Sequence, residues 1–195
     1  MTIDKFHKIE NKVIETITGS FNKAINISIP DFILLVVRGG YHNHLDKPGI
    51  DLSPFVIEDR KDFLIDLTRK KFFVKYINDY VSRLQNERSM SDDEKEFDTN
   101  IQLMIYTHIW ESHLFLNQLV RLAKIQLGMG YDWITKLDYP KKNVHHNESN
   151  LSHVKKGPYI ENSIINRFEK SDCNMAQLIK HCYLKELRDD FAHST

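Results

Sequence analysis

Apolar residues recur every three or four positions along two long stretches of this chain, residues 58–88 and 91–127. This spacing places them on one face of an α-helix. In the first stretch they are Phe63, Leu64, Leu67, Phe72, Tyr76, Tyr80, Val81 and Leu84. In the second they are Phe97, Ile101, Met104, Ile105, Ile109, Leu116, Leu119, Val120 and Ala123. Because only a short turn joins the two stretches, we predict an all-α fold, a helical bundle built around two long antiparallel helices.

Residues with known preferences for helix ends support this prediction. Ser91 and Glu94 have the spacing of a capping box, which begins a helix, and Gly128 and Gly130 are suited to ending one. Pro158 is suited to the first turn of a further helix, whose apolar residues are Ile160, Ile164, Ile165 and Phe168. A last helix is expected to begin at Ser171 and Asp172. Its inward-facing residues are expected to be Met175, Leu178, Ile179, Cys182 and Leu187.

The N-terminal region shows the same helical spacing at first and then becomes ambiguous. Residues 2–27 are predicted to be a helix. Residues 32–37 form a short apolar run between Pro30 and Gly39, and periodicity cannot decide between a short buried helix and a strand. Residues 40–53 are predicted to be a loop that turns at Pro48 and Gly49.

Length and composition favour one domain in a reducing compartment. The 195 residues are enough for a single domain spanning 1–195, in which the polar, non-periodic residues 138–157 are expected to form a mobile loop. Two cysteines are too few for a disulfide framework, and we expect half-buried, reduced thiols. No signal-peptide pattern or membrane-length apolar run is present. We therefore expect a cytoplasmic protein with no membrane association.

The C-terminal residues bring together groups that suit RNA cleavage. Arg188, Asp189 and His193 lie within six positions on one short amphipathic stretch. The histidine can transfer a proton near neutral pH, the arginine can hold a phosphate, and the carboxylate can orient either of them. The simpler alternative is an exposed basic helix end, with Arg188 in an ion pair and His193 near the helix C-terminus.

This stretch resembles the signature of the HEPN superfamily of helical nucleotide-binding domains, in which an arginine, a polar residue and, after a short gap, a histidine follow one another. Ala192 matches the small residue that the family usually has before the histidine. The stretches around Trp110 and Gly130 also look like a bacterial HEPN subgroup. The resemblance implies a homodimer with a composite active site, in which His193 acts as general base or acid on the 2′-hydroxyl. Arg188 would stabilise the scissile phosphate, and Asp189 would orient either Arg188 or His193.

The implied activity is a metal-independent endoribonuclease that leaves 2′,3′-cyclic phosphate and 5′-hydroxyl ends and needs no cofactor. Phage defence or toxin–antitoxin biology is the role that the resemblance implies, with an antitoxin or regulatory protein as a partner. The alternative from another class is a catalytically inactive helical module that binds RNA or protein.

Further residues are candidates for supporting roles. Glu111 is placed in an apolar helix, where a carboxylate usually has a cationic partner, and Arg188 or Arg121 could supply it. The equally good alternative is that Glu111 faces solvent. The 27 basic and 27 acidic residues balance, so RNA binding requires a local patch. The candidates for that patch are Lys141, Lys142, Lys155 and Lys156.

Two groups of residues contain several histidines but lack zinc-ligand spacing, so no metal site is expected. The first group is His42, His44 and Asp46, and the second is His145, His146 and His153.

Overall fold

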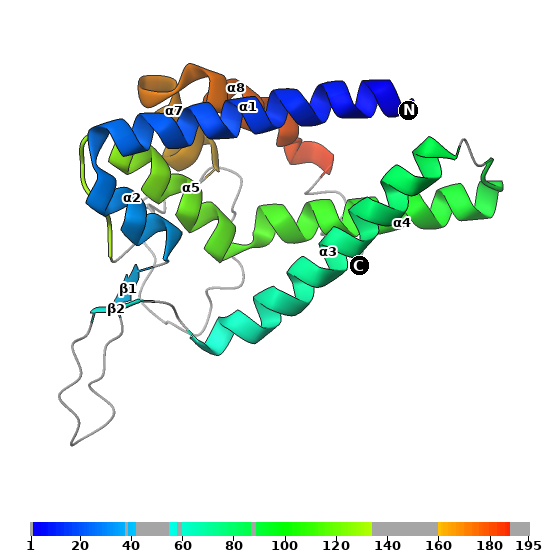
Figure 1. Ribbon diagram of the computed structural model, residues 1–195, viewed down its shortest axis with the longest axis horizontal. Helices are drawn as coiled ribbons and strands as arrows, with labels where there is room; N and C mark the ends of the chain where they lie inside the picture. The colour runs from blue at the N-terminus through cyan, green and yellow to red at the C-terminus, as the bar shows by residue number, and fades with distance from the viewer. Residues whose placement is uncertain are drawn as a thin grey trace.

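The computed structural model describes residues 2–37, 39–41, 55–57, 60–86, 89–133 and 160–187, with backbone alone at 39–41, 55–57, 60–70, 111, 113, 114 and 162. These residues form eight helices and one short hairpin, so the predicted all-α character is confirmed (Figure 1). The first elements are α1 (Ile3–Ile27), α2 (Ile29–Val36), β1 (Gly39–Tyr41), β2 (Phe55–Ile57) and α3 (Arg60–Gln85). The others are α4 (Asp92–Glu111), α5 (His113–Gln126), the π-helix η2 (Ile160–Ile165), α7 (Asn166–Ser171) and α8 (Cys173–Cys182).

The ambiguous apolar run at residues 32–37 is helical as far as Val36, where α2 ends. Ser28 caps α2, because its hydroxyl accepts a hydrogen bond from the Asp31 backbone N–H at 3.3 Å, and Pro30 lies in the first turn. Both residues favour a helix start, so the sequence held a signal that the apolar spacing lacked. Of the α2 side chains only Leu35 is buried.

A short antiparallel hairpin follows α2. Gly39 pairs with Ile57 and Tyr41 with Phe55. The loop predicted over residues 40–53 is therefore wrong for Gly40 and Tyr41, which belong to β1, and the rest of it lies outside the described residues. Its Pro48 and Gly49 turn lies outside the described residues.

The predicted second long helix is two helices. α4 ends at Glu111, and Ser112 adopts an extended conformation with φ −69° and ψ 108°. The Ser112 hydroxyl accepts a hydrogen bond from the Phe115 N–H at 3.3 Å and so caps α5. Two other predicted ends are confirmed: the Ser91–Glu94 capping box begins α4, and Gly128, with φ 71°, follows α5.

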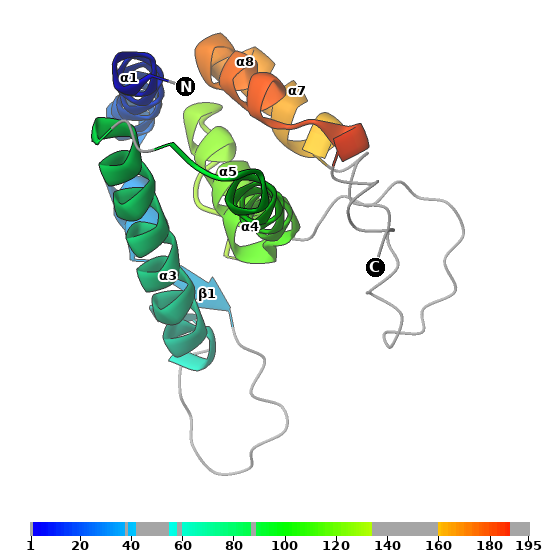
Figure 2. The ribbon, with the colours of Figure 1, turned by 90° about the vertical axis from the view of Figure 1, so that its right-hand side faces the viewer.

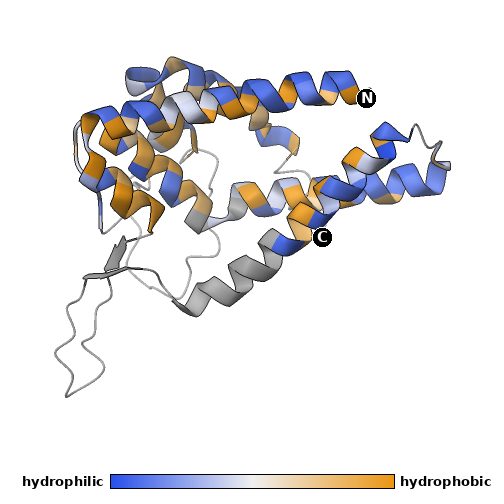
Figure 3. Cartoon of the chain, in the orientation of Figure 1, coloured by the Kyte–Doolittle hydropathy of each residue, from blue (hydrophilic) through white to orange (hydrophobic). Residues whose placement is uncertain are grey.

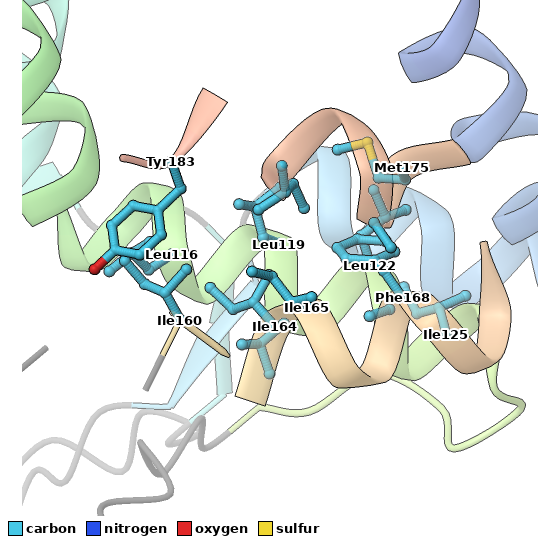
Figure 4. Packing of buried hydrophobic residues seen from close by; sticks show 14 of the residues in the cluster. Leu116, Leu119, Leu122, Ile125, Ile160, Ile164, Ile165, Phe168, Met175 and Tyr183 are labelled. Atoms are coloured by element: carbon cyan, nitrogen blue, oxygen red, sulfur yellow. The ribbon is translucent and has the colours of Figure 1, made fainter. Parts of the chain in front are cut away.

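The buried core is centred on α5. Figure 2 shows α5 packed below both α1 and the pair formed by α7 and α8. Side chains from α5 interlock with those of η2, α7 and α8, as Figure 4 shows. The core members from these four helices are Leu116, Leu119, Val120, Leu122, Ala123, Ile125, Ile160, Ile164, Ile165, Phe168, Met175, Ala176 and Ile179. The four apolar residues predicted to follow Pro158 are thus all buried, although the first three lie on a π-helix.

The expectation that the two long helices form the heart of the bundle is wrong for the described side chains of α3 and for most of α4. It is confirmed for α5, the second half of the predicted second helix, where Leu116, Leu119, Val120 and Ala123 are buried. α3 and α4 cross on one side of the molecule (Figure 1), and no side chain from residues 71–86 is buried. Phe72 is 49% exposed and Phe97 is 69% exposed, although both were predicted to face inward. Figure 3 shows mostly polar residues at the start of α4, which leaves little apolar surface there for a partner helix to cover.

Polar contacts fix α1, α7 and α8 around α5. The Gln126 side-chain N–H donates to the backbone oxygen and the hydroxyl of Ser20, each at 2.7 Å. The Ser171 hydroxyl donates to the side-chain amide oxygen of Gln126 at 2.9 Å. Asp172 caps α8, as predicted, and pairs with Lys23 at 2.9 Å. Among the described residues, no helix is both long enough and apolar enough to cross a membrane.

Candidate functional site

The segment that follows α8 leads directly to the sequence motif. α8 ends at Cys182, Tyr183 and Leu184 are not helical, and residues 185–187 are helical again. The last helix was expected to carry Cys182 and Leu187 inward, and this is wrong, because both are exposed. Tyr183 adopts an extended conformation with φ −95° and ψ 104°, so the helical spacing does not continue across it. Both cysteines are exposed free thiols, although half-buried ones were expected.

The predicted catalytic residues Arg188, Asp189 and His193 lie immediately beyond the described residues. Glu111 is the last residue of α4, but only its backbone is described, so its pairing stays a prediction. The four candidate RNA-binding lysines and the expected mobile loop at residues 138–157 lie outside the described residues, and so do both histidine groups. No group of three or more potential metal ligands was found in the part of the chain that the structure describes.

The backbone of Leu184 is held by a tyrosine of α4. The Tyr106 hydroxyl donates a hydrogen bond to the Leu184 carbonyl oxygen at 3.0 Å. The same hydroxyl accepts a hydrogen bond from the Leu184 N–H at 2.6 Å. Leu184 lies four residues before Arg188, so α4 fixes the chain directly before the motif.

Aromatic side chains complete this anchor. The buried Trp110 ring lies 5.1 Å from that of Tyr183, 5.8 Å from that of Phe115 and 6.4 Å from that of Tyr106. Tyr183 is buried and lies near Leu116 and Ile160 (Figure 4). We call Tyr106, Trp110, Tyr183 and Leu184 the α4 anchor. Sequence reasoning missed it because the two halves are far apart in the chain and the hydrogen bonds involve backbone atoms.

An open cavity of about 300 Å³ lies beside the α4 anchor, and its lining carries both charge signs. Lys180 and Glu169 form an ion pair across it. Its lining residues are Glu161, Ile165, Asn166, Glu169, Lys180, Tyr183 and Lys185.

The stretch after α5 is fixed by two basic residues of that helix. Arg121 donates to the Asp132 carbonyl oxygen at 3.1 Å, and its guanidinium lies 5.1 Å from the centre of the Tyr131 ring. Lys124 pairs with the Asp132 carboxylate. Burial raises the pKa of Tyr131 above its usual range. Arg121, considered above as a partner of Glu111, therefore has a structural role here.

A second charged cluster connects α3 and α4. The Asp98 carboxylate accepts hydrogen bonds from Arg83 at 2.7 Å, from the Tyr76 hydroxyl at 2.9 Å and from the Gln102 side-chain amide at 2.8 Å. Burial by itself raises the pKa of Asp98, but these three hydrogen bonds outweigh it, and the pKa is lowered. All four groups are used within the cluster, so we assign it a structural role.

Comparisons of the chain with protein-family models, with curated proteins and with solved structures found no match.

Proposed function

We propose that the protein is a metal-independent endoribonuclease of the HEPN type. His193 would take the proton of a 2′-hydroxyl, whose oxygen then attacks the neighbouring phosphorus. Arg188 would stabilise the negative charge on the phosphate, and Asp189 would orient one of the two side chains. The bond to the 5′-oxygen breaks, that oxygen takes up a proton, and the products carry a 2′,3′-cyclic phosphate and a 5′-hydroxyl.

The observation that carries the proposal is the motif of Arg188, Asp189 and His193 directly after a firmly held segment. A catalytic site needs its groups held in place by rigid surroundings. The α4 anchor supplies a fixed starting point for the motif at Leu184. The all-α character is compatible with a HEPN-like bundle.

The same proposal includes a homodimer, since two facing motifs would build one composite cleft. Lys141, Lys142, Lys155 and Lys156 would contact the RNA backbone, and Glu111 would support Arg188. Phage defence or a toxin–antitoxin system, with an antitoxin or regulatory protein as partner, is the proposed biological setting.

The first prediction tests the chemistry. Purified protein is incubated with total RNA in excess EDTA, beside His193→Ala, and the product ends are analysed. We expect cyclic-phosphate ends in the presence of EDTA from the wild type and none from the variant, because the imidazole is needed for proton transfer. His181→Ala is the matched control, because His181 is an exposed histidine of α8 outside the motif, and it should retain activity. Intact RNA with the wild type would contradict the proposal.

A binding module without catalysis is the second candidate, and exposed apolar side chains favour it. Ile29, Ile33 and Val36 are 59%, 54% and 62% exposed. Their spacing of four and three residues puts them on one face of α2, as in helices that bind another protein. In that case RNA would stay intact with both the wild type and His193→Ala, and the variant would bind its partner as the wild type does.

A further inference from the structure

We propose that one face of α3 binds single-stranded RNA. It is formed by Lys71, Phe72, Lys75 and Asn78, which are all exposed and fall within about a third of the circumference of the helix. We call these four residues the α3 face. The inference does not depend on cleavage, because a protein that only binds RNA would use the same face. The choice of RNA over DNA alone rests on the proposed function.

The structure leaves this part of α3 uncovered. Each residue from 71 to 75 is exposed, and five helical residues cover more than one turn, so α3 is exposed on every side at this point. Figure 2 shows α3 along one edge of the described helices. The Phe72 side chain is 49% exposed. Its ring therefore offers a flat apolar surface on which a base can stack.

Charge is divided between the two crossing helices, although the chain as a whole is neutral. The sequence of α3 has seven basic and three acidic residues, whereas that of α4 has six acidic and one basic. Lys71 and Lys75 lie one turn apart beside Phe72, where they can contact phosphates on either side of a stacked base. Asp79 is the only acidic residue among residues 71–86. The α3 face thus provides the local basic patch that a neutral chain needs in order to bind RNA.

The mixture of residues favours a nucleic acid over a protein partner. Protein interfaces are enriched in aromatic residues but depleted in lysine. Sites for single strands, in contrast, combine positive charge along the backbone with rings that stack on the bases. The exposed phenylalanine of α4 has the opposite setting: Phe97 is 69% exposed and shares its side of the helix with Asp93 and Glu94. That surface repels phosphate.

Phe72→Leu tests the stacking contact, because leucine keeps an apolar side chain and suits a helix but has no ring. Phe97→Leu is the matched control, since it makes the same change at a more exposed position in acidic surroundings. Binding of a fluorescent 2′-O-methylated oligouridine is measured by anisotropy. This probe lacks the 2′-hydroxyl that the proposed cleavage requires. We expect Kd to rise about tenfold in Phe72→Leu and to stay unchanged in Phe97→Leu.

Replacing Lys71 and Lys75 together by alanine tests the charge. Each phosphate contact on a single strand contributes about 0.7 to the slope of log Kd against log salt concentration, so this slope should fall by about 1.4 in the double variant. Lys95→Ala is the control, because Lys95 is an exposed lysine of α4 that pairs with Asp92. It should leave the slope unchanged.

The outcomes separate this inference from the proposed function. A wild type that binds the probe but leaves total RNA intact overturns the proposed cleavage alone. Normal probe binding by Phe72→Leu overturns the α3 face alone, and so does a wild type that does not bind the probe. A dimer in solution that Phe72→Leu dissociates would show that a second copy covers this face, and it would overturn the inference as well.

Discussion

At the scale of single residues, Asp98 illustrates how one carboxylate can hold two helices whose apolar contact is small. It accepts hydrogen bonds from Tyr76 and Arg83 of α3 and from Gln102 of its own helix. The Arg83 guanidinium also lies 5.6 Å from the Tyr80 ring centre. Because the described side chains of α3 include none that is buried, these polar contacts account for much of its attachment.

Asp98→Asn should lower the free energy of unfolding by about 2 kcal/mol at pH 7, because hydrogen bonds to a charged group are lost. The folded-state pKa of Asp98 is lowered. Its contribution is therefore complete well above the unfolded-state pKa of about 3.9 and is lost as pH falls below that value toward the lower folded-state pKa. Urea unfolding of both proteins at pH 7 and pH 3 would test this. The difference between them should shrink at pH 3.

Asp79→Asn is the control for that series. Asp79 is an exposed carboxylate of α3 with no ion pair or hydrogen bond among the described residues, and its substitution should leave stability nearly unchanged at both values. If Asp98→Asn lowered the free energy of unfolding by the same amount at pH 7 and pH 3, the charge of Asp98 would not be the cause.

At the scale of helices and their ends, the corner between α4 and α5 determines where the α4 anchor lies. Ser112 interrupts what would otherwise be a continuous helix, and α5 then enters the core while α4 crosses α3 (Figure 1). Trp110, two residues before the corner, is therefore able to contact both Phe115 of α5 and Tyr183 beyond α8.

Ser112→Ala should lower the free energy of unfolding by about 1 kcal/mol, because the Phe115 N–H loses its cap. Chemical denaturation of the variant measures this loss. Ser89→Ala changes an exposed serine between α3 and α4 that makes no hydrogen bond among the described residues, and it should have no measurable effect. Equal stability of the two variants would mean that the Ser112 cap contributes nothing.

The helices and most of their ends were predictable, because local chemistry sets them. The first helix, the Ser91 cap and the Asp172 cap follow from residue types at fixed spacings. The break at Ser112 was not predictable, because the apolar spacing continues from Ile109 to Leu116 across it. Periodicity also shows that residues share a face, but not whether another helix covers that face. The α4 anchor depends on a backbone contact between distant residues, which leaves no local pattern.

At the scale of the whole molecule, packing is uneven. α5 carries fully buried residues such as Ala123 and Ile125, whereas residues 71–86 of α3 have none that is buried. The free energy of local opening should therefore be higher along α5 than along residues 71–86, because regions with few buried apolar contacts open locally at lower cost.

Amide exchange under native conditions should therefore be slow along α5 and faster by at least about tenfold along residues 71–86. Peptides from α8 provide an internal reference, because Met175, Ala176 and Ile179 are buried there. Equal protection of α3 and α5 would contradict this gradient and indicate that α3 is covered in solution.

The contact between Tyr106 and Leu184 also has a kinetic consequence. It joins residues 78 positions apart, so forming it closes a long loop at a considerable cost in chain entropy. The core helices between them must first bring the ends together. We therefore expect the contact to form late in folding and to be lost early in unfolding, so that Leu184, before Arg188, is held in place only after the core helices have packed.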